Sequence, residues 1–207
     1  NILNFEGVKG LENNKWTPND DVPTYDCSIP FIRMISGPMD YTPGAMRNAT
    51  KSEFKPSNSN PVSQGTRCHQ LALYTIFEAP LQMMADSPTA YMAAQESTDF
   101  IAKIPTVFDE TVALDGEVGK YIAIARKKGN NWYLGAITNW NSRDITIDFS
   151  FLEKGKTFEA DLFTDGLNAE KAAVDYKREK ITVDSSTKMT FHLASGGGLS
   201  AIITAKN

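Results

Sequence analysis

The sequence predicts an α/β half followed by an all-β half that forms an antiparallel β-sandwich. Two observations support this prediction. Residues 64–101 place apolar side chains in a helix-like rhythm, and strand-like and turn-rich stretches precede them. After Pro105 the pattern changes to short alternating runs that turn residues separate at regular intervals, as is typical of a sandwich of about seven strands.

In the first half, the apolar run at residues 29–35 predicts a strand, and the turn-rich residues 36–44 that follow predict a loop with a functional role. Residues 48–61 are mainly Asn, Ser, Lys and Pro without periodicity, which indicates a surface loop. A helix is expected over residues 64–85, with a kink or break at Pro80.

A second, shorter helix is expected over residues 89–101. Ser87 can cap its first turn, and Pro88 suits a position where the missing N–H costs nothing. In the second half, the alternating runs predict strands at residues 121–127, 132–139, 145–149, 157–163, 180–183, 188–193 and 199–205.

Two features of the β half have competing interpretations. The aromatic residues Trp132, Tyr133, Trp140 and Phe149 could form a sugar-binding platform, but packing in the core or at a sheet edge is the default for aromatics in strands. The glycine run at residues 196–198 lacks the Lys and Ser/Thr spacing of a phosphate loop, so it predicts a hairpin connection.

Composition excludes several classes of protein. The chain has 207 residues, 41% hydrophobic and 22% charged, which fits one large or two small globular domains. The net charge is -4 and no basic run is present, so nucleic acid is not expected as a partner. No apolar stretch approaches the roughly 20 residues that cross a bilayer. Because the chain begins with Asn1 instead of Met, we expect a processed or truncated piece of a longer protein.

Cysteine and histidine offer little chemistry. Cys27 and Cys68 are expected to be free buried thiols, because one possible bridge is far from a disulfide framework. His69 and His192 have no ligand-type neighbours at zinc spacing, so no zinc site is expected from this chain alone.

The strongest candidate for chemistry is the pair of carboxylates at Glu6 and Glu12. Neither a strand nor a helix brings residues six apart together, since they would lie roughly 20 Å apart along a strand and roughly 240° apart around a helix. A tight turn at Gly7 and Gly10 could aim both side chains into one pocket. The alternative is a solvated strand-to-loop junction with two surface acids.

Several segments together resemble the C-terminal third of glycoside hydrolase family 97 enzymes. They are EGVKGLE at residues 6–12, PFIR at 30–33, GPMDYTPG at 37–44, SQGTR at 63–67, LALY at 71–74 and PTVFDET at 105–111. The resemblance covers nearly the whole chain. It implies that residues 1–103 are the C-terminal portion of a catalytic (β/α)8 barrel and that residues 104–207 are a C-terminal β-sandwich.

The same resemblance implies the activity of a calcium-dependent, exo-acting α-glycosidase that hydrolyses terminal α-linked galactose or glucose of an oligosaccharide. Glu12 falls on the general acid, and Glu6 and Glu12 fall on the calcium site. These roles agree with physical chemistry. Ca²⁺ takes oxygen ligands, and the active sites of such barrels lie at the C-terminal ends of the strands. Glycoside cleavage needs one protonated carboxyl and a second carboxylate.

The second carboxylate and further calcium ligands are expected upstream, in the remainder of the barrel, so this chain alone is expected to be inactive. Asp40 and Tyr41 are candidate sugar contacts; the alternative is a turn whose Asp caps a backbone group. Tyr25 stands where inverting glucosidase members tend to carry histidine, which favours the galactosidase-like branch. Neither the sugar nor the stereochemical outcome is settled by the sequence.

Two rival functions are left open. One is a non-catalytic carbohydrate-binding module, in which the sandwich binds glycan and the α/β half supports it. The other is a sandwich that only supports the barrel and contacts no ligand. The resemblance also implies the periplasm or outer surface of a Gram-negative bacterium, with an export signal upstream of this chain.

Overall fold

The computed structural model describes residues 4–16 and 20–206. Residues 1–3, where the apolar sequence predicts the middle of a strand, lie outside the described residues. The second half of the chain is a two-layer antiparallel structure, as the alternating pattern predicted. Its large sheet has the strand order β3-β4-β5-β10-β7-β8, and its small sheet pairs β6 with β9.

The strands of the large sheet are β3 (Glu110–Glu117), β4 (Tyr121–Lys128), β5 (Asn131–Thr138), β7 (Thr157–Asp165), β8 (Tyr176–Asp184) and β10 (Gly198–Ala205). The small sheet consists of β6 (Arg143–Asp148) and β9 (Lys188–Leu193), and the short 3-10 helix η3 (Phe149–Phe151) follows β6. Apolar residues between the two sheets form one core that includes Leu134, Phe158, Leu162 and Leu199.

The aromatic residues of this half mostly pack, which confirms the default interpretation. Trp132 and Tyr133 are each 5% exposed and Phe149 is 1% exposed. Trp140 is half-buried, and the Lys51 ammonium lies 5.9 Å from the centre of its ring.

Two expectations about this half were incomplete or wrong. The strand β3 was not predicted, because most of its side chains are exposed and a bulge at Ala113/Asp115 interrupts its alternation. The glycine run at residues 196–198 is not a hairpin. It connects β9 to β10, which belong to different sheets, so the chain crosses between layers there.

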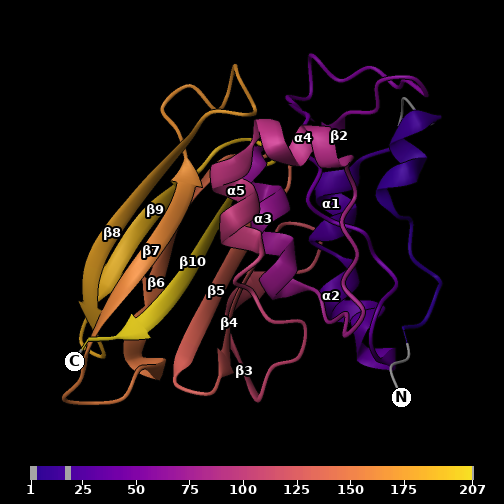
Figure 1. Ribbon diagram of the computed structural model, residues 1–207. Coiled ribbons are helices and arrows are strands. Elements are labelled where there is room, and N and C mark those ends of the chain that lie inside the picture. The colour runs from indigo at the N-terminus through magenta and orange to yellow at the C-terminus, as the bar shows by residue number, and fades with distance from the viewer. Residues whose placement is uncertain (1–3, 17–19, 207) are drawn as a thin grey trace.

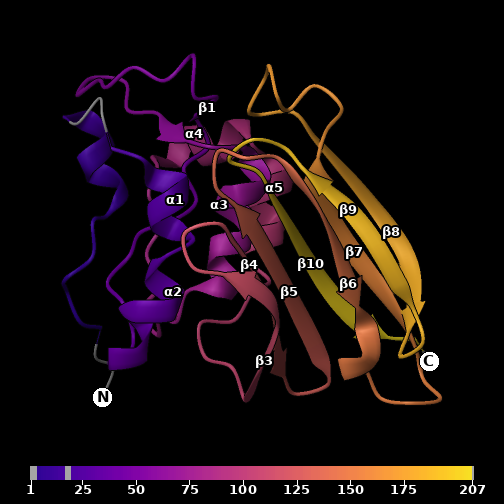
Figure 2. The ribbon, with the colours of Figure 1, turned by 180° about the vertical axis from the view of Figure 1, so that it is seen from behind.

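The first half covers the other face of the large sheet. Its main helix, α3 (Arg67–Ile76), is buried along its whole length and packs against β5 and β10. Helices α4 (Pro88–Ala93) and α5 (Gln95–Ile101) follow, and Figure 1 shows α5 beside α3. Figure 2, from behind, shows β6 and β9 on the opposite side of the sheet from these helices.

The remaining elements of this half are short. They are the 3-10 helices η1 (Leu11–Lys15) and η2 (Met34–Ser36), the helices α1 (Val22–Asp26) and α2 (Ile29–Ile32), and the parallel pair β1 (Asn48–Ala49) and β2 (Ser63–Gln64).

The strand expected at residues 29–35 was wrong, because this stretch is helical. Pro30 lies in the first turn of α2 and has no N–H to donate to a sheet ladder, which outweighs the β-branched isoleucines around it. The helix expected over residues 64–85 ends at Ile76, where Phe77 is extended, ahead of the expected break at Pro80. Ser87 caps α4 as predicted: its side chain accepts a hydrogen bond from the Ala90 N–H.

Candidate functional site

The site begins where two short parallel segments lie side by side. Phe5 and Met39 form a parallel bridge, in which the Phe5 N–H donates to the Pro38 carbonyl and the Asp40 N–H donates to the Phe5 carbonyl, each at 3.0 Å. Because the segments are parallel, the residues that follow them, Glu6 and Asp40, emerge at the same end. Both side chains are exposed.

Arg33 fixes the first of these segments. Its Nη2 donates to the Phe5 and Glu6 carbonyls at 2.7 Å each, and its Nε donates to the Glu6 carbonyl at 3.1 Å. Its Nη1 donates to the Gly37 carbonyl at 3.3 Å. Gly7 then turns the chain with φ of 90°, a conformation that favours glycine. Gly10, in contrast, has an ordinary φ of -75°, so only one of the two expected glycine hinges uses the left-handed region.

Tyr25 and Asp20 hold the turn between the two glycines. The Tyr25 hydroxyl accepts a hydrogen bond from the Lys9 N–H at 2.7 Å, and the Lys9 ammonium pairs with Asp20 at 3.0 Å. Desolvation raises the pKa of Tyr25, so its hydroxyl stays protonated at neutral pH. The loop that carries Glu12 is therefore attached to α1.

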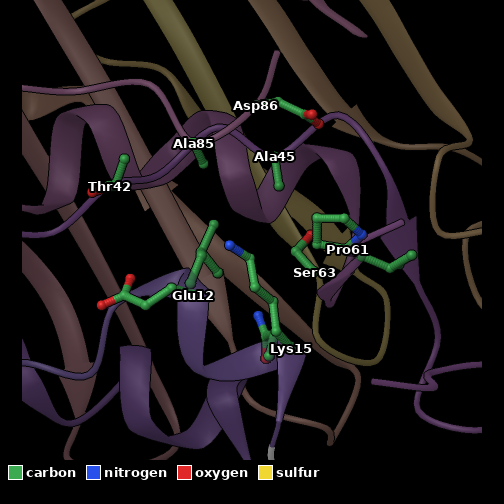
Figure 3. Close-up of a pocket in the computed structure, with 11 residues that line it drawn as sticks. Glu12, Lys15, Thr42, Ala45, Pro61, Ser63, Ala85 and Asp86 are labelled. Atoms are coloured by element: carbon green, nitrogen blue, oxygen red, sulfur yellow. The ribbon is translucent and has the colours of Figure 1, made fainter. Parts of the chain in front are cut away.

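Glu12 lies on η1 and lines a pocket of about 160 Å³. The opposite wall consists of Thr42, Ala45 and residues 61–63 and 85–86. Figure 3 shows the Glu12 carboxylate at one end of the pocket and Pro61 and Ser63 at the other. Glu6 is not among the residues that line this pocket, so the described part of the chain does not bring the two carboxylates into one cavity.

Tyr41 is buried instead of open to the pocket. It is 1% exposed, and its ring packs edge-on against Phe77 with 4.7 Å between ring centroids. Desolvation and the nearby Asp26 carboxylate raise the pKa of Tyr41. Its hydroxyl has no hydrogen-bond partner among the described residues.

Sequence reasoning missed a buried acid–histidine pair behind the site. His69 Nε2 lies 3.2 Å from Asp26 Oδ2, and His69 Nδ1 lies 3.3 Å from the Gly197 carbonyl oxygen. Both side chains are fully buried, and desolvation raises the pKa of Asp26. The pair joins α1, α3 and the β9–β10 connection. No spacing in the sequence signals it, because the partners lie 43 and 128 residues apart.

The metal prediction can be compared with the donors present. Within residues 4–16 and 20–206, no group of three or more His, Cys, Asp or Glu residues is placed to hold a metal ion. Carboxylates such as those of Glu6 and Glu12 suit Ca²⁺, but this ion takes six to eight oxygen ligands. The carboxylate oxygens of Glu6 and Glu12 are of the type that Ca²⁺ binds, and the remaining oxygen ligands would have to come from outside the described residues. Cys27 and Cys68 are buried free thiols.

Comparison with known proteins gives concordant matches. Residues 107–204 match the family model described as Glycosyl-hydrolase 97 C-terminal, oligomerisation. The chain is 56% identical over 199 residues to a retaining alpha-galactosidase from Bacteroides thetaiotaomicron, covering 96% of this chain and 30% of that relative. The chain therefore spans less than a third of the length of this relative.

Two solved structures of a glycoside hydrolase family 97 enzyme from Pseudoalteromonas sp. strain K8 are also similar. One is a complex with panose and has a TM-score of 0.88, and the other is a complex with acarbose and has a TM-score of 0.87. Each is 39% identical to this chain and covers 98% of it, whereas the chain covers 31% of each. None of the helices in the described part of our chain combines the length and apolar character that crossing a bilayer needs.

Proposed function

Because the chain belongs to glycoside hydrolase family 97, we propose that it is the C-terminal part of an exo-acting retaining α-galactosidase, with Glu12 as general acid and base. The observation that carries this proposal is the 56% identity to a retaining alpha-galactosidase over nearly the whole chain. The alignment leaves out only eight of the 207 residues, so it includes the position of Glu12.

The arrangement of the first half supports a barrel origin. A short segment ending at Phe5, the helices α1 and α2, a parallel segment ending at Met39 and the helix α3 follow one another in the order of two β/α units. In such barrels the active site lies beyond the C-terminal ends of the strands, which is where Glu6, Glu12 and Asp40 follow. We propose residues 1–103 as barrel and residues 104–207 as the C-terminal domain.

In this proposal Glu12 protonates the glycosidic oxygen as the bond to the leaving group breaks. The same carboxylate then removes a proton from the water that hydrolyses the glycosyl-enzyme intermediate. The nucleophilic carboxylate would come from upstream of this chain. Asp40, exposed at the strand end, would contact the sugar. Tyr41 lies behind it and would shape the pocket wall mainly through its backbone.

We also propose that Glu6 and Glu12 contribute to a calcium site that upstream residues complete. A bound Ca²⁺ would supply positive charge beside the substrate oxygens. The proposed location is the periplasm or outer surface of a Gram-negative bacterium, and cell fractionation of the producing organism tests it.

The test of Glu12 is its replacement by Gln in the full-length enzyme. We expect a loss of kcat/KM on the order of a thousandfold or more for melibiose, and a much smaller loss for 2,4-dinitrophenyl α-galactoside, whose leaving group needs no proton. Azide should accelerate the variant and give α-galactosyl azide. Glu153→Gln, an exposed change in the sandwich, serves as the control. Equal losses on both substrates, without an azide product, would contradict the assignment.

A further inference from the structure

The pocket beside Glu12 contains a second set of polar groups on the same turn. Asn14 and Lys15 follow Glu12 on η1 and line the same pocket. Figure 3 shows the Lys15 side chain extending from η1 into the space between Glu12 and Ser63. One short element thus contributes an acidic, an amide and a basic residue to the lining of a single cavity.

Asn14 is the most unusual of these residues. It is only 2% exposed, and neither its Oδ1 nor its Nδ2 has a hydrogen-bond partner among the described residues. A buried amide without partners costs roughly 1–3 kcal/mol for each unsatisfied group. Such a cost is tolerated where a ligand supplies the missing partners. A sugar hydroxyl can do so, because it both donates and accepts a hydrogen bond.

Two polar side chains across the pocket, those of Asp86 and Ser63, are already engaged. The Asp86 carboxylate accepts hydrogen bonds from the Met46 and Ser87 N–H groups at 2.9 Å each. The Ser63 hydroxyl donates to the Arg47 carbonyl at 3.2 Å. Neither wall residue is placed to satisfy Asn14, and no ion pair of Lys15 occurs within residues 4–16 and 20–206. The side chains of Asn14 and Lys15 thus have no hydrogen-bond or ion-pair partner among the described residues, and the Asn14 amide is buried at the pocket wall.

We propose that Asn14 and Lys15 bind the hydroxyl groups of the leaving-group sugar, next to the carboxyl that protonates the bond to it. The proposal rests on the proposed function, since it places the leaving group on the Glu12 side of the scissile bond. The residues would then set the preference for glycosyl over aryl leaving groups.

The experiment compares melibiose, whose leaving group is glucose, with 4-nitrophenyl α-galactoside, whose leaving group lacks sugar hydroxyls. The variants Asn14→Ala, Asn14→Asp and Lys15→Gln are made in the full-length enzyme. Lys154→Gln is the matched control, because Lys154 is exposed in the sandwich. For each protein, kcat/KM is measured on both substrates and expressed as the ratio of melibiose to the aryl galactoside.

We expect the ratio to fall on the order of tenfold in Asn14→Ala and Lys15→Gln, since each loses a hydrogen bond to the leaving group. Lys154→Gln should keep the wild-type ratio. If Asn14→Ala does not fold, Asn14→Asp and Lys15→Gln give the same comparison. An active enzyme whose ratio stays within about twofold in these variants overturns this proposal alone. A wild-type enzyme that hydrolyses no α-galactoside overturns the proposed function as well.

Discussion

Arg33 illustrates how one side chain positions a candidate site without entering it. Its guanidinium holds the backbone on either side of the turn that leads to Glu6. A lysine carries the same charge but cannot donate to three carbonyls in this planar arrangement. The geometry of the proposed calcium ligand therefore depends on an arginine at this position.

We predict that Arg33→Lys in the full-length enzyme weakens calcium binding by roughly tenfold and lowers stability by about 1–2 kcal/mol. Calorimetric calcium titration and urea unfolding measure the two effects. Arg47→Lys is the control, because among the described residues the Arg47 guanidinium pairs with Asp86 alone, at 3.8 Å. Calcium affinity that is equal in both variants would show that Arg33 does not position the ligand.

Asp165 gives a prediction about pH. It accepts hydrogen bonds from the Thr66 hydroxyl and the Ala194 and Gly198 N–H groups, yet desolvation raises its pKa from 3.8 to about 6. Between these pKa values the folded state binds more protons than the unfolded state. The contribution of Asp165 to the free energy of unfolding therefore decreases as pH rises from about 4 to about 6.

Asp165→Asn should remove this dependence. We expect the stability of the wild type relative to the variant to fall by up to about 3 kcal/mol between pH 4 and pH 7. Urea unfolding of both proteins at the two pH values measures it. A difference that does not change with pH would contradict the raised pKa.

At the residue scale, residue type and spacing indicated the segment at residues 6–12 as a candidate site. The roles of Glu6 and Glu12, and Asp40 and Tyr41 as sugar contacts, were predicted from the family resemblance and stay predictions. The burial of Tyr41 and the pairing of Asp26 with His69 could not be predicted, because both depend on contacts with distant parts of the chain. Asn14 was missed since an asparagine on a polar turn gives no signal until its burial is known.

At the scale of elements, the contact between α3 and β5 depends on a residue without a side chain. A Cβ at Gly135 would lie 2.8 Å from the Ala72 carbonyl oxygen and 3.1 Å from Thr75 Cβ. Both neighbours belong to α3, so the helix can approach the sheet only because position 135 is glycine.

We predict that Gly135→Ala lowers the free energy of unfolding by about 1–3 kcal/mol, because the clash involves helix backbone that cannot move independently. Gly129→Ala is the comparison. Its φ is 57° and nothing lies within 4 Å of the added Cβ, so only the backbone cost of about 1 kcal/mol applies. Thermal unfolding of both variants checks the order. A Gly135→Ala protein as stable as the wild type would mean that α3 shifts freely.

The elements that the sequence predicted well are those whose environment is regular. The sequences of the strands from β4 to β10 either alternate apolar and polar residues or are continuously apolar, depending on whether one or both faces of the strand are buried. This pattern was sufficient to predict them as strands. Residues 29–35 were misassigned since an apolar run of this length fits a strand or a buried helix equally, and only Pro30 distinguishes them. The edge strand β3 lacks a clear apolar face.

At the scale of the whole molecule, the central strands β4, β5 and β10 of the large sheet are buried on both faces. One face meets the small sheet, and the other meets the first half of the chain. Ile122, Ile124 and Ile137 belong to the same core cluster as Leu73 and Phe77, although the proposed domain boundary falls between them. Tyr133, Phe163 and Ile202 pack in the same way with Leu71 and Phe100.

We therefore predict that residues 104–207 expressed alone expose an apolar face, bind the dye ANS and aggregate, whereas residues 1–207, which retain α3 and the segments that cover it, bind less dye and stay soluble. Dye fluorescence and size-exclusion chromatography of the two pieces make the comparison. A monomeric 104–207 piece that unfolds cooperatively and binds no dye would contradict this dependence.

The intimate fit of α3 on the sheet also bears on how such enzymes can diversify. Recombination that grafts a C-terminal module from one ancestor onto the catalytic body of another would succeed most readily with a crossover before Thr66. The helix and the strands beneath it would then be inherited as one unit. A crossover near residue 104 would place the α3 helix of one ancestor on the strands of another. Most such hybrids would be destabilised, because the helix would no longer match the surface around Gly135.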